Sequence, residues 1–217
     1  MSQTRASAKK FYPTFSTMSV VGILVFLVLL YWLSSLEEWF THKYLMHQKL
    51  DIPWFRSYAT SHMEHHLAVN PDFTLKNKVP DQVCFEAITV FPFFVVNSII
   101  CVHLFRKYLK WYVIVFIVFL FALYAALAWN TIHTYIHSSD VKMCKIGGLF
   151  KGPVNKDNPY MKWAVNNHQA HHYFKGDEKG NYNVVFPGTD FLFGTHKVMP
   201  EPKDAGVPMV TELFLAS

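Results

Sequence analysis

The feature that most limits how this chain can fold is an apolar stretch of nineteen residues, Trp111–Trp129, that runs without interruption. A helix of that length spans roughly 28 Å, enough to cross the hydrocarbon core of a bilayer. A helix on the surface of a soluble protein needs a polar stripe, and this stretch has none. The sequence therefore predicts a membrane-spanning helix here, rather than a buried core helix of a soluble protein.

Two further apolar segments precede this one. They run from about residue 18 to 36 and from about residue 87 to 105, and the second contains Pro92, which we expect to kink it. Only Arg106–Lys110 joins the second and third segments, so the two are predicted to form an antiparallel hairpin. Basic residues before the first segment resemble the start of a signal peptide. Because no small-residue cleavage site follows, an uncleaved anchor helix is favoured.

The hairpin brings the remaining polar sequence to one membrane face. Residues 37–81 and 130–217 are expected to form a shared polar cap there, with one more short helix at about 160–172. We therefore predict an all-α fold: a single domain over residues 1–217, built as an integral membrane helical bundle of about three transmembrane helices with a histidine-rich cap. Such a multi-pass protein would lie in the endoplasmic reticulum of a eukaryote or the inner membrane of a bacterium. Basic residues flank the spans on both sides and leave the orientation open.

The composition agrees with a lipid environment. Hydrophobic residues make up 52% of the chain and charged residues only 16%, against about 25% in soluble proteins. The net charge of +5 suits contact with anionic headgroups, and the absence of a Lys/Arg-dense stripe argues against nucleic-acid binding. Cys84, Cys101 and Cys144 lie far apart, so we predict neither a disulfide framework nor a zinc ribbon, and a reducing compartment is favoured.

Ten of the twelve histidines fall into four clusters in or beside the predicted cap. They are His42 and His47; His62, His65 and His66; His133 and His137; and His168, His171 and His172. Positions i, i+3 and i+4 share a helix face, so each triplet projects to one side. The spacing of His42 and His47 suits a helix only if the helix ends or loosens between them. Ten neutral imidazoles exceed the needs of one ion and predict two metal ions with about five ligands each.

The other two histidines are set aside. His103 lies near the hairpin end of its segment, far from the clusters, and His196 is interpreted as a surface residue. Five polar residues beside or between the clusters are candidates to orient the imidazole N–H groups. They are Glu38, Glu64, Asn130, Asp140 and Asn167. Glu64 could equally be a solvated helix residue, and no catalytic side chain is predicted beyond the metal ligands.

The order of the four motifs resembles the fatty acid hydroxylase superfamily, which contains fatty acid and sphingolipid hydroxylases, sterol desaturases and carotenoid hydroxylases. The resemblance covers about residues 37–78 and 130–197. It includes Glu38 before the first motif and the segment Asn183–Thr195, which is similar to the C-terminal signature of that group. It implies that the ten clustered histidines bind two iron ions, with zinc as a substitute in purified protein. It also implies dioxygen as oxidant, a membrane lipid as substrate and an external electron-transfer protein.

The expected activity is therefore hydroxylation of a lipid by a dioxygen-dependent di-iron monooxygenase. A fatty acyl or sphingolipid substrate is favoured, with a sterol or a carotenoid left open. The same centre could instead desaturate the lipid. A non-enzymatic alternative is a histidine-rich membrane protein that transports or stores metal. Transport predicts ligands near the bilayer midplane, where the spans offer only Asn97 and His103, so the enzyme is preferred.

Overall fold

The computed structural model of the chain describes residues 20–47, 49–70, 73–76, 84, 87–137 and 158–199. Over these residues the chain is helical and contains no strand, only an isolated antiparallel bridge between Val69 and Leu75. The helices are α1 (Val20–Phe40), η1 (Thr41–Met46), η2 (Pro53–Phe55), α2 (Arg56–Ala68), α3 (Ala87–Phe105), α4 (Trp111–Ile136), α5 (Pro159–Tyr173), η6 (Gly176–Glu178) and α6 (Thr189–Leu192). The predicted all-α fold is confirmed for the described part of the chain.

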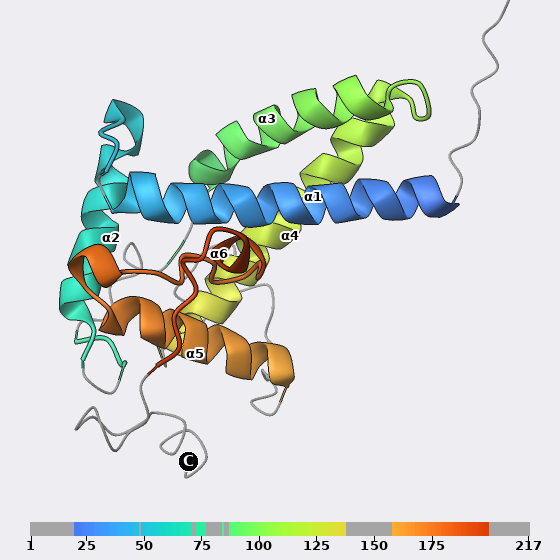
Figure 1. The fold of residues 1–217 in the computed structure, drawn as a ribbon. Coiled ribbons are helices and arrows are strands. Elements are labelled where there is room, and N and C mark those ends of the chain that lie inside the picture. The colour runs from blue at the N-terminus through green and yellow to red at the C-terminus, as the bar shows by residue number, and fades with distance from the viewer. Residues whose placement is uncertain are drawn as a thin grey trace, which may run out of the picture.

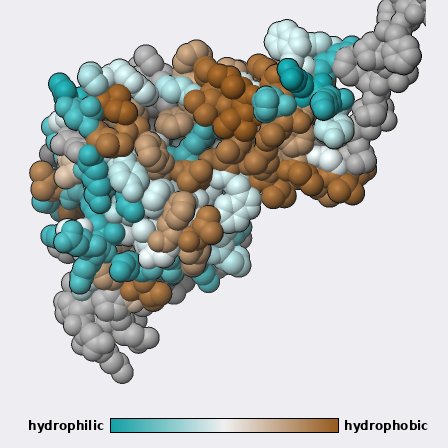
Figure 2. Space-filling model, turned by 45° about the horizontal axis from the view of Figure 1, so that its top comes forward, coloured by the Kyte–Doolittle hydropathy of each residue, from teal (hydrophilic) through white to brown (hydrophobic). Residues whose placement is uncertain are grey.

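Two helices are long and apolar enough to cross a membrane. They are Val20–Met46, which joins α1 to η1, and Trp111–Ile136, which is α4. Only 17% and 22% of their most apolar stretches are buried, so most of these side chains face outward. The apolar part of α3, Val90–Phe105, is shorter. Figure 2 shows an extended hydrophobic surface over the long helices, with hydrophilic residues gathered mainly at the other end of the molecule.

The predicted hairpin of the second and third segments is present. α3 continues through Pro92 to Phe105, and α4 begins at Trp111, so the connection is as short as expected. α1 crosses this hairpin (Figure 1). Side chains from all three helices form one buried apolar cluster, made of Phe26, Leu30, Cys101, Ile114 and Val118. The ring of Phe26 packs edge-on against Phe105, with 4.9 Å between centroids.

A second apolar cluster lies where η1, η2, α5 and the segment after η6 meet the C-terminal half of α4. Its centre is formed by Leu45, Phe55, Trp129, Ile136, Ala164 and Val184–Phe186. The start of α5 is fixed locally, because Asn158 caps it through its side chain and Pro159 occupies the first turn. The short helix predicted at 160–172 is thereby confirmed.

The cysteines differ from the prediction at one position. Cys101 is a free, buried thiol, as expected, whereas Cys84 is disulfide-bonded. Three widely spaced cysteines give no sequence pattern that marks a disulfide, because distance along the chain does not fix distance in space. A disulfide at Cys84 does not support the predicted reducing compartment.

Candidate metal centre

Nine of the ten clustered histidines form two compact groups. Within each group the ligand nitrogens all lie within 4.8 Å of one another. The first histidine group consists of His42, His47, His62, His66 and His171. The second histidine group consists of His65, His137, His168 and His172. The tenth residue, His133, lies beside the second group, with its Nε2 atom 3.0 Å from that of His168.

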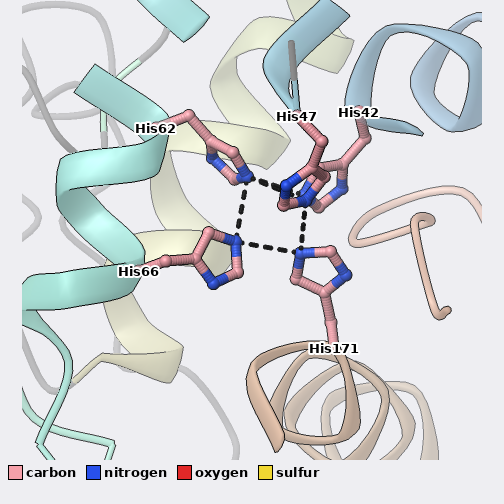
Figure 3. A group of neighbouring side chains, drawn as sticks. All are labelled: His42, His47, His62, His66 and His171. Carbon is pink, nitrogen blue, oxygen red and sulfur yellow. Dashed lines mark hydrogen bonds between the residues drawn. The ribbon is translucent and has the colours of Figure 1, made fainter. Parts of the chain in front are cut away.

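The first group gathers side chains from three parts of the fold (Figure 3). His42 and His47 come from η1 and its C-terminal end, His62 and His66 come from α2, and His171 comes from α5. Four Nε2 atoms form a ring: His62 to His47 at 3.4 Å, His47 to His171 at 3.1 Å, His171 to His66 at 3.1 Å and His66 to His62 at 3.1 Å. The Nε2 atom of His42 lies 3.2 Å from that of His62. All five rings therefore point one nitrogen at a common centre.

The second group is built around His168 on α5. Its Nε2 atom lies 3.0 Å from the Nε2 atoms of His133, His137 and His172. His65 joins from α2, with its Nε2 atom 3.2 Å from that of His172. The triplet on α2 is thus divided, because His62 and His66 serve the first group and His65 serves the second. The triplet on α5 is divided in the same way.

A π-helix resolves the five-residue spacing of the first motif. The chain passes from α1 into η1, a π-helix over Thr41–Met46 that contains His42 and ends just before His47. A π-helix pairs residues i and i+5, and single π turns are frequent at functional sites. The widened turn places the rings of His42 and His47 in a stack, 5.4 Å apart and 12° from parallel. The predicted loosening of the helix is confirmed and has a definite form.

Backbone carbonyls orient three of the rings. His42 Nδ1 lies 2.7 Å from the Tyr182 carbonyl, His171 Nδ1 lies 2.8 Å from the Gly180 carbonyl, and His137 Nδ1 lies 2.9 Å from that of Phe73. A carbonyl oxygen can only accept, so Nδ1 carries the proton in each case. The Nε2 atom then presents its lone pair to the centre of the group, as a metal ligand requires.

Hydrogen bonding among the rings cannot account for this packing. An imidazole Nε2 has one proton or one lone pair, so it makes one good hydrogen bond. Yet the Nε2 atoms of His62 and His168 each have three Nε2 neighbours within 3.4 Å. Converging lone pairs repel one another unless a cation lies between them. The two groups therefore fit a metal ion by geometry and by donor chemistry.

The rings are held in the neutral state that binds metal. Burial, reinforced by the neighbouring histidines, holds the pKa of His62, His65, His168 and His172 well below the ordinary value. Burial lowers the pKa of His47 to about 2 and that of His137 to about 3. A neutral imidazole keeps the free lone pair that an incoming cation needs.

Two of the residues expected to orient the rings, Glu38 and Asn167, form hydrogen bonds with backbone groups. The Glu38 carboxylate accepts hydrogen bonds from the backbone N–H groups of Val185 and Phe186, at 2.8 and 2.9 Å, not from an imidazole. Glu64 is exposed on α2, which matches its interpretation as a solvated residue. The Asn167 amide donates to the Asn183 carbonyl at 2.5 Å.

The other two candidates are Asn130 and Asp140. Asn130 is fully buried one turn before His133, and its carbonyl accepts from the Thr134 hydroxyl. Asp140 lies outside the described residues. The two histidines set aside stay away from both groups: His103 is exposed, and His196 stacks on Phe191 with 4.2 Å between ring centroids.

The partners that sequence reasoning missed are the carbonyls of Gly180 and Tyr182. They belong to the segment that leads into Asn183–Thr195, and a dense set of hydrogen bonds fixes that segment. The Asp190 carboxylate accepts from the backbone N–H groups of Tyr182 and Asn183, at 3.0 and 2.7 Å. The similarity of Asn183–Thr195 to a C-terminal signature was the one signal near these carbonyls, and it did not include Gly180 or Tyr182.

An apolar cavity lies beside the first histidine group. Side chains of α1, α3 and α4 line it, and it contains about 740 Å³ of space, counting the part open to the surroundings. Thr41, Met46 and Trp129 form the wall nearest the histidines. The Trp129 ring stands 5.1 Å from the His133 ring and 6.1 Å from the His42 ring, centroid to centroid. One tryptophan therefore separates the cavity from His42 of the first group and from His133, which lies beside the second group.

Comparison of the chain with protein-family models, with curated protein sequences and with solved structures gives no match.

Proposed function

We propose that the protein is a membrane oxidoreductase that uses a dinuclear metal centre and dioxygen to hydroxylate a lipid. The observation that carries this proposal is the contact between the apolar cavity and the histidine rings through Trp129. An apolar cavity that ends at a metal site suits an apolar substrate with its reacting carbon beside the metal.

Two ions are supported by the separation of the ligands into two groups. Five rings in the first group, and four rings with His133 in the second, match the coordination needs of two ions. Iron is the metal that the resemblance to the fatty acid hydroxylase superfamily implies, and zinc would fit the same rings. A bound iron pair would supply the reduction of dioxygen and the removal of hydrogen from an unactivated C–H bond.

The residues of this chain would provide position and environment. The carbonyls of Tyr182, Gly180 and Phe73 fix the tautomer of three ligands before the metal binds. The apolar wall of the cavity would exclude bulk water from the reacting carbon. Electrons would come from a separate electron-transfer protein, as the resemblance implies.

A membrane location is supported by the outward-facing apolar side chains of α1 and α4. In the proposed arrangement α3 is the third span, paired with α4, and the histidine groups lie in a cap at the membrane face where α1 and α4 end. A lipid could then enter the cavity from the bilayer without crossing water. Transport of metal is disfavoured because the histidine groups lie at the helix ends and not at mid-membrane.

The test is a lipid analysis under isotopically heavy dioxygen. Membranes that contain the wild-type chain should yield a lipid with one added heavy oxygen atom. His65→Ala and His171→Ala, one in each histidine group, should abolish this product, whereas His103→Ala should not. Product formation by both ligand variants at the wild-type rate would refute the proposal. A lipid that has lost two hydrogens would identify desaturation by the same centre.

A further inference from the structure

A band of polar side chains crosses the wall of the apolar cavity. Ser34, Glu37 and Thr41 follow one another at i, i+3 and i+7 along α1 and the start of η1, so they share one face. Asn97 of α3 lies opposite, and its amide donates to the Glu37 carboxylate at 2.8 Å. A cavity that bound only a hydrocarbon chain would gain nothing from these polar side chains, because a hydrocarbon forms no hydrogen bonds.

Two atoms of the band have no hydrogen-bond partner within the described residues. They are Asn97 Oδ1 and Thr41 Oγ1, in side chains that are only 6% and 5% exposed. Turning the Asn97 amide over does not remove the problem, because one of its two polar atoms always faces away from Glu37. Buried polar atoms nearly always have a partner, so each unpaired one requires an explanation.

The position of these atoms indicates a ligand. Both side chains line the cavity, and Thr41 directly precedes the metal-site residue His42. Ser98, the neighbour of Asn97, also has an unpaired hydroxyl, but it is not part of the cavity wall. The free Asn97 oxygen is an acceptor, so the group that completes it must be a donor. Among apolar molecules, an alcohol meets that requirement without bringing a charge into the cavity.

We propose that the cavity binds a lipid alcohol, whose hydroxyl group donates to Asn97 Oδ1. The rest of the lipid would extend along the cavity toward Trp129 and the histidine rings. Asn97 would then be a specificity-determining residue, since the distance from the hydroxyl group to the metal centre would set which carbon reacts. This inference rests on the proposed function only for turnover, and binding can be measured without it.

The test uses two photoreactive probes, a long-chain alcohol and the hydrocarbon of equal length that lacks the hydroxyl group. The full chain is reconstituted in phosphatidylcholine nanodiscs, and labelling of cavity peptides is measured against the mole fraction of each probe in the bilayer. The alcohol should half-saturate the wild-type cavity at a mole fraction about tenfold lower than the hydrocarbon. Asn97→Leu should bring the two probes within twofold of each other, and the hydrocarbon should still bind.

Two variants serve as controls. Ser98→Ala removes the neighbouring hydroxyl outside the cavity and should keep the preference for the alcohol. Thr41→Val keeps the shape of the side chain and should lower the preference only partly if Asn97 is the main acceptor. Equal binding of the two probes by the wild-type chain would overturn the inference, and so would a tenfold preference retained in Asn97→Leu. The comparison on the wild-type chain decides the matter even if Asn97→Leu does not fold.

The binding assay on metal-depleted protein, run beside the heavy-dioxygen product assay on metal-loaded protein, separates the two proposals. A preference for the alcohol without any oxygenated product would leave this inference standing and refute the proposed activity. Oxygenated product with no preference for the alcohol would do the reverse.

Discussion

The Glu38 carboxylate links α1 to the segment that orients two of the metal-site rings. One oxygen accepts from the Val185 N–H at 2.8 Å, and the other accepts from the Phe186 N–H at 2.9 Å. The second oxygen also lies 3.3 Å from the Asn183 amide nitrogen. Glu38→Gln keeps the size of the side chain but replaces one acceptor oxygen with an NH2 group. That group would face a backbone donor, so at least one hydrogen bond is lost.

The magnitude follows from the chemistry of the lost contact. A buried backbone donor left without its acceptor costs about 1–3 kcal/mol. For a chain of this length, 1 kcal/mol shifts the unfolding midpoint by roughly 2–4 °C. We therefore expect Glu38→Gln to lower the midpoint by on the order of 5 °C. Metal affinity should fall as well, because the carbonyls that hold His42 and His171 belong to the adjoining residues.

Thermal unfolding in detergent, followed by circular dichroism, provides the assay. Glu64→Gln is the matched control, since it makes the same chemical change on an exposed residue of α2 and should shift the midpoint by less than about 1 °C. A Glu38→Gln midpoint as close to wild type as the control would refute the assignment of Glu38 as a structural acceptor.

Three further perturbations probe other parts of the site. Acidification below about pH 6.5 should destabilise the metal-depleted protein, because histidines of the unfolded chain become protonated in that range. In the folded chain the pKa of His47 is lowered to about 2 and that of His137 to about 3, so these two side chains stay neutral. Each of these residues lowers the free energy of unfolding by about 1.4 kcal/mol per pH unit as the pH falls from about 6.5 toward the pKa in the folded chain. A denaturation midpoint that does not change between pH 7 and pH 5 would contradict this expectation. Gly180→Ala should reduce metal binding, because its Cβ atom would lie 2.1 Å from the Thr195 carbonyl and would displace the carbonyl that holds His171. Gly176→Ala, which meets nothing within 4 Å, should cost only the roughly 1–2 kcal/mol of a positive φ and leave metal content unchanged in elemental analysis. Ala125→Phe should fill the cavity and reduce labelling by both photoreactive probes, whereas the outward-facing Leu120→Phe should not.

The sequence was sufficient to predict α1, α3, α4 and α5 and the convergence of the histidines. Two apolar stretches and the short linker Arg106–Lys110 determine the α3–α4 hairpin, because a helix that leaves the cap must return to it. The i, i+3, i+4 spacing places each triplet on one face, and the structure brings all the clustered residues close together. Local periodicity carries this information, so one sequence is enough to reveal it.

The sequence did not reveal how the ligands are shared or what orients them. The division of His62 and His66 from His65 depends on how α2 meets η1 and α5, which is a matter of tertiary packing. The Nδ1 partners are backbone carbonyls, and every residue type has one, so no pattern of side chains marks them. The disulfide at Cys84 escaped prediction for a similar reason, since sequence separation says little about distance in space.

The central claim, that the two histidine groups each hold a metal ion, is tested most directly by the metal-to-chain ratio of purified protein. Elemental analysis should give about two ions per chain for the wild type and for His103→Ala. His62→Ala in the first group and His168→Ala in the second should each lower the ratio to about one, because each removes the ring with three close Nε2 neighbours. A wild-type ratio well below two, unchanged by either substitution, would contradict the dinuclear centre.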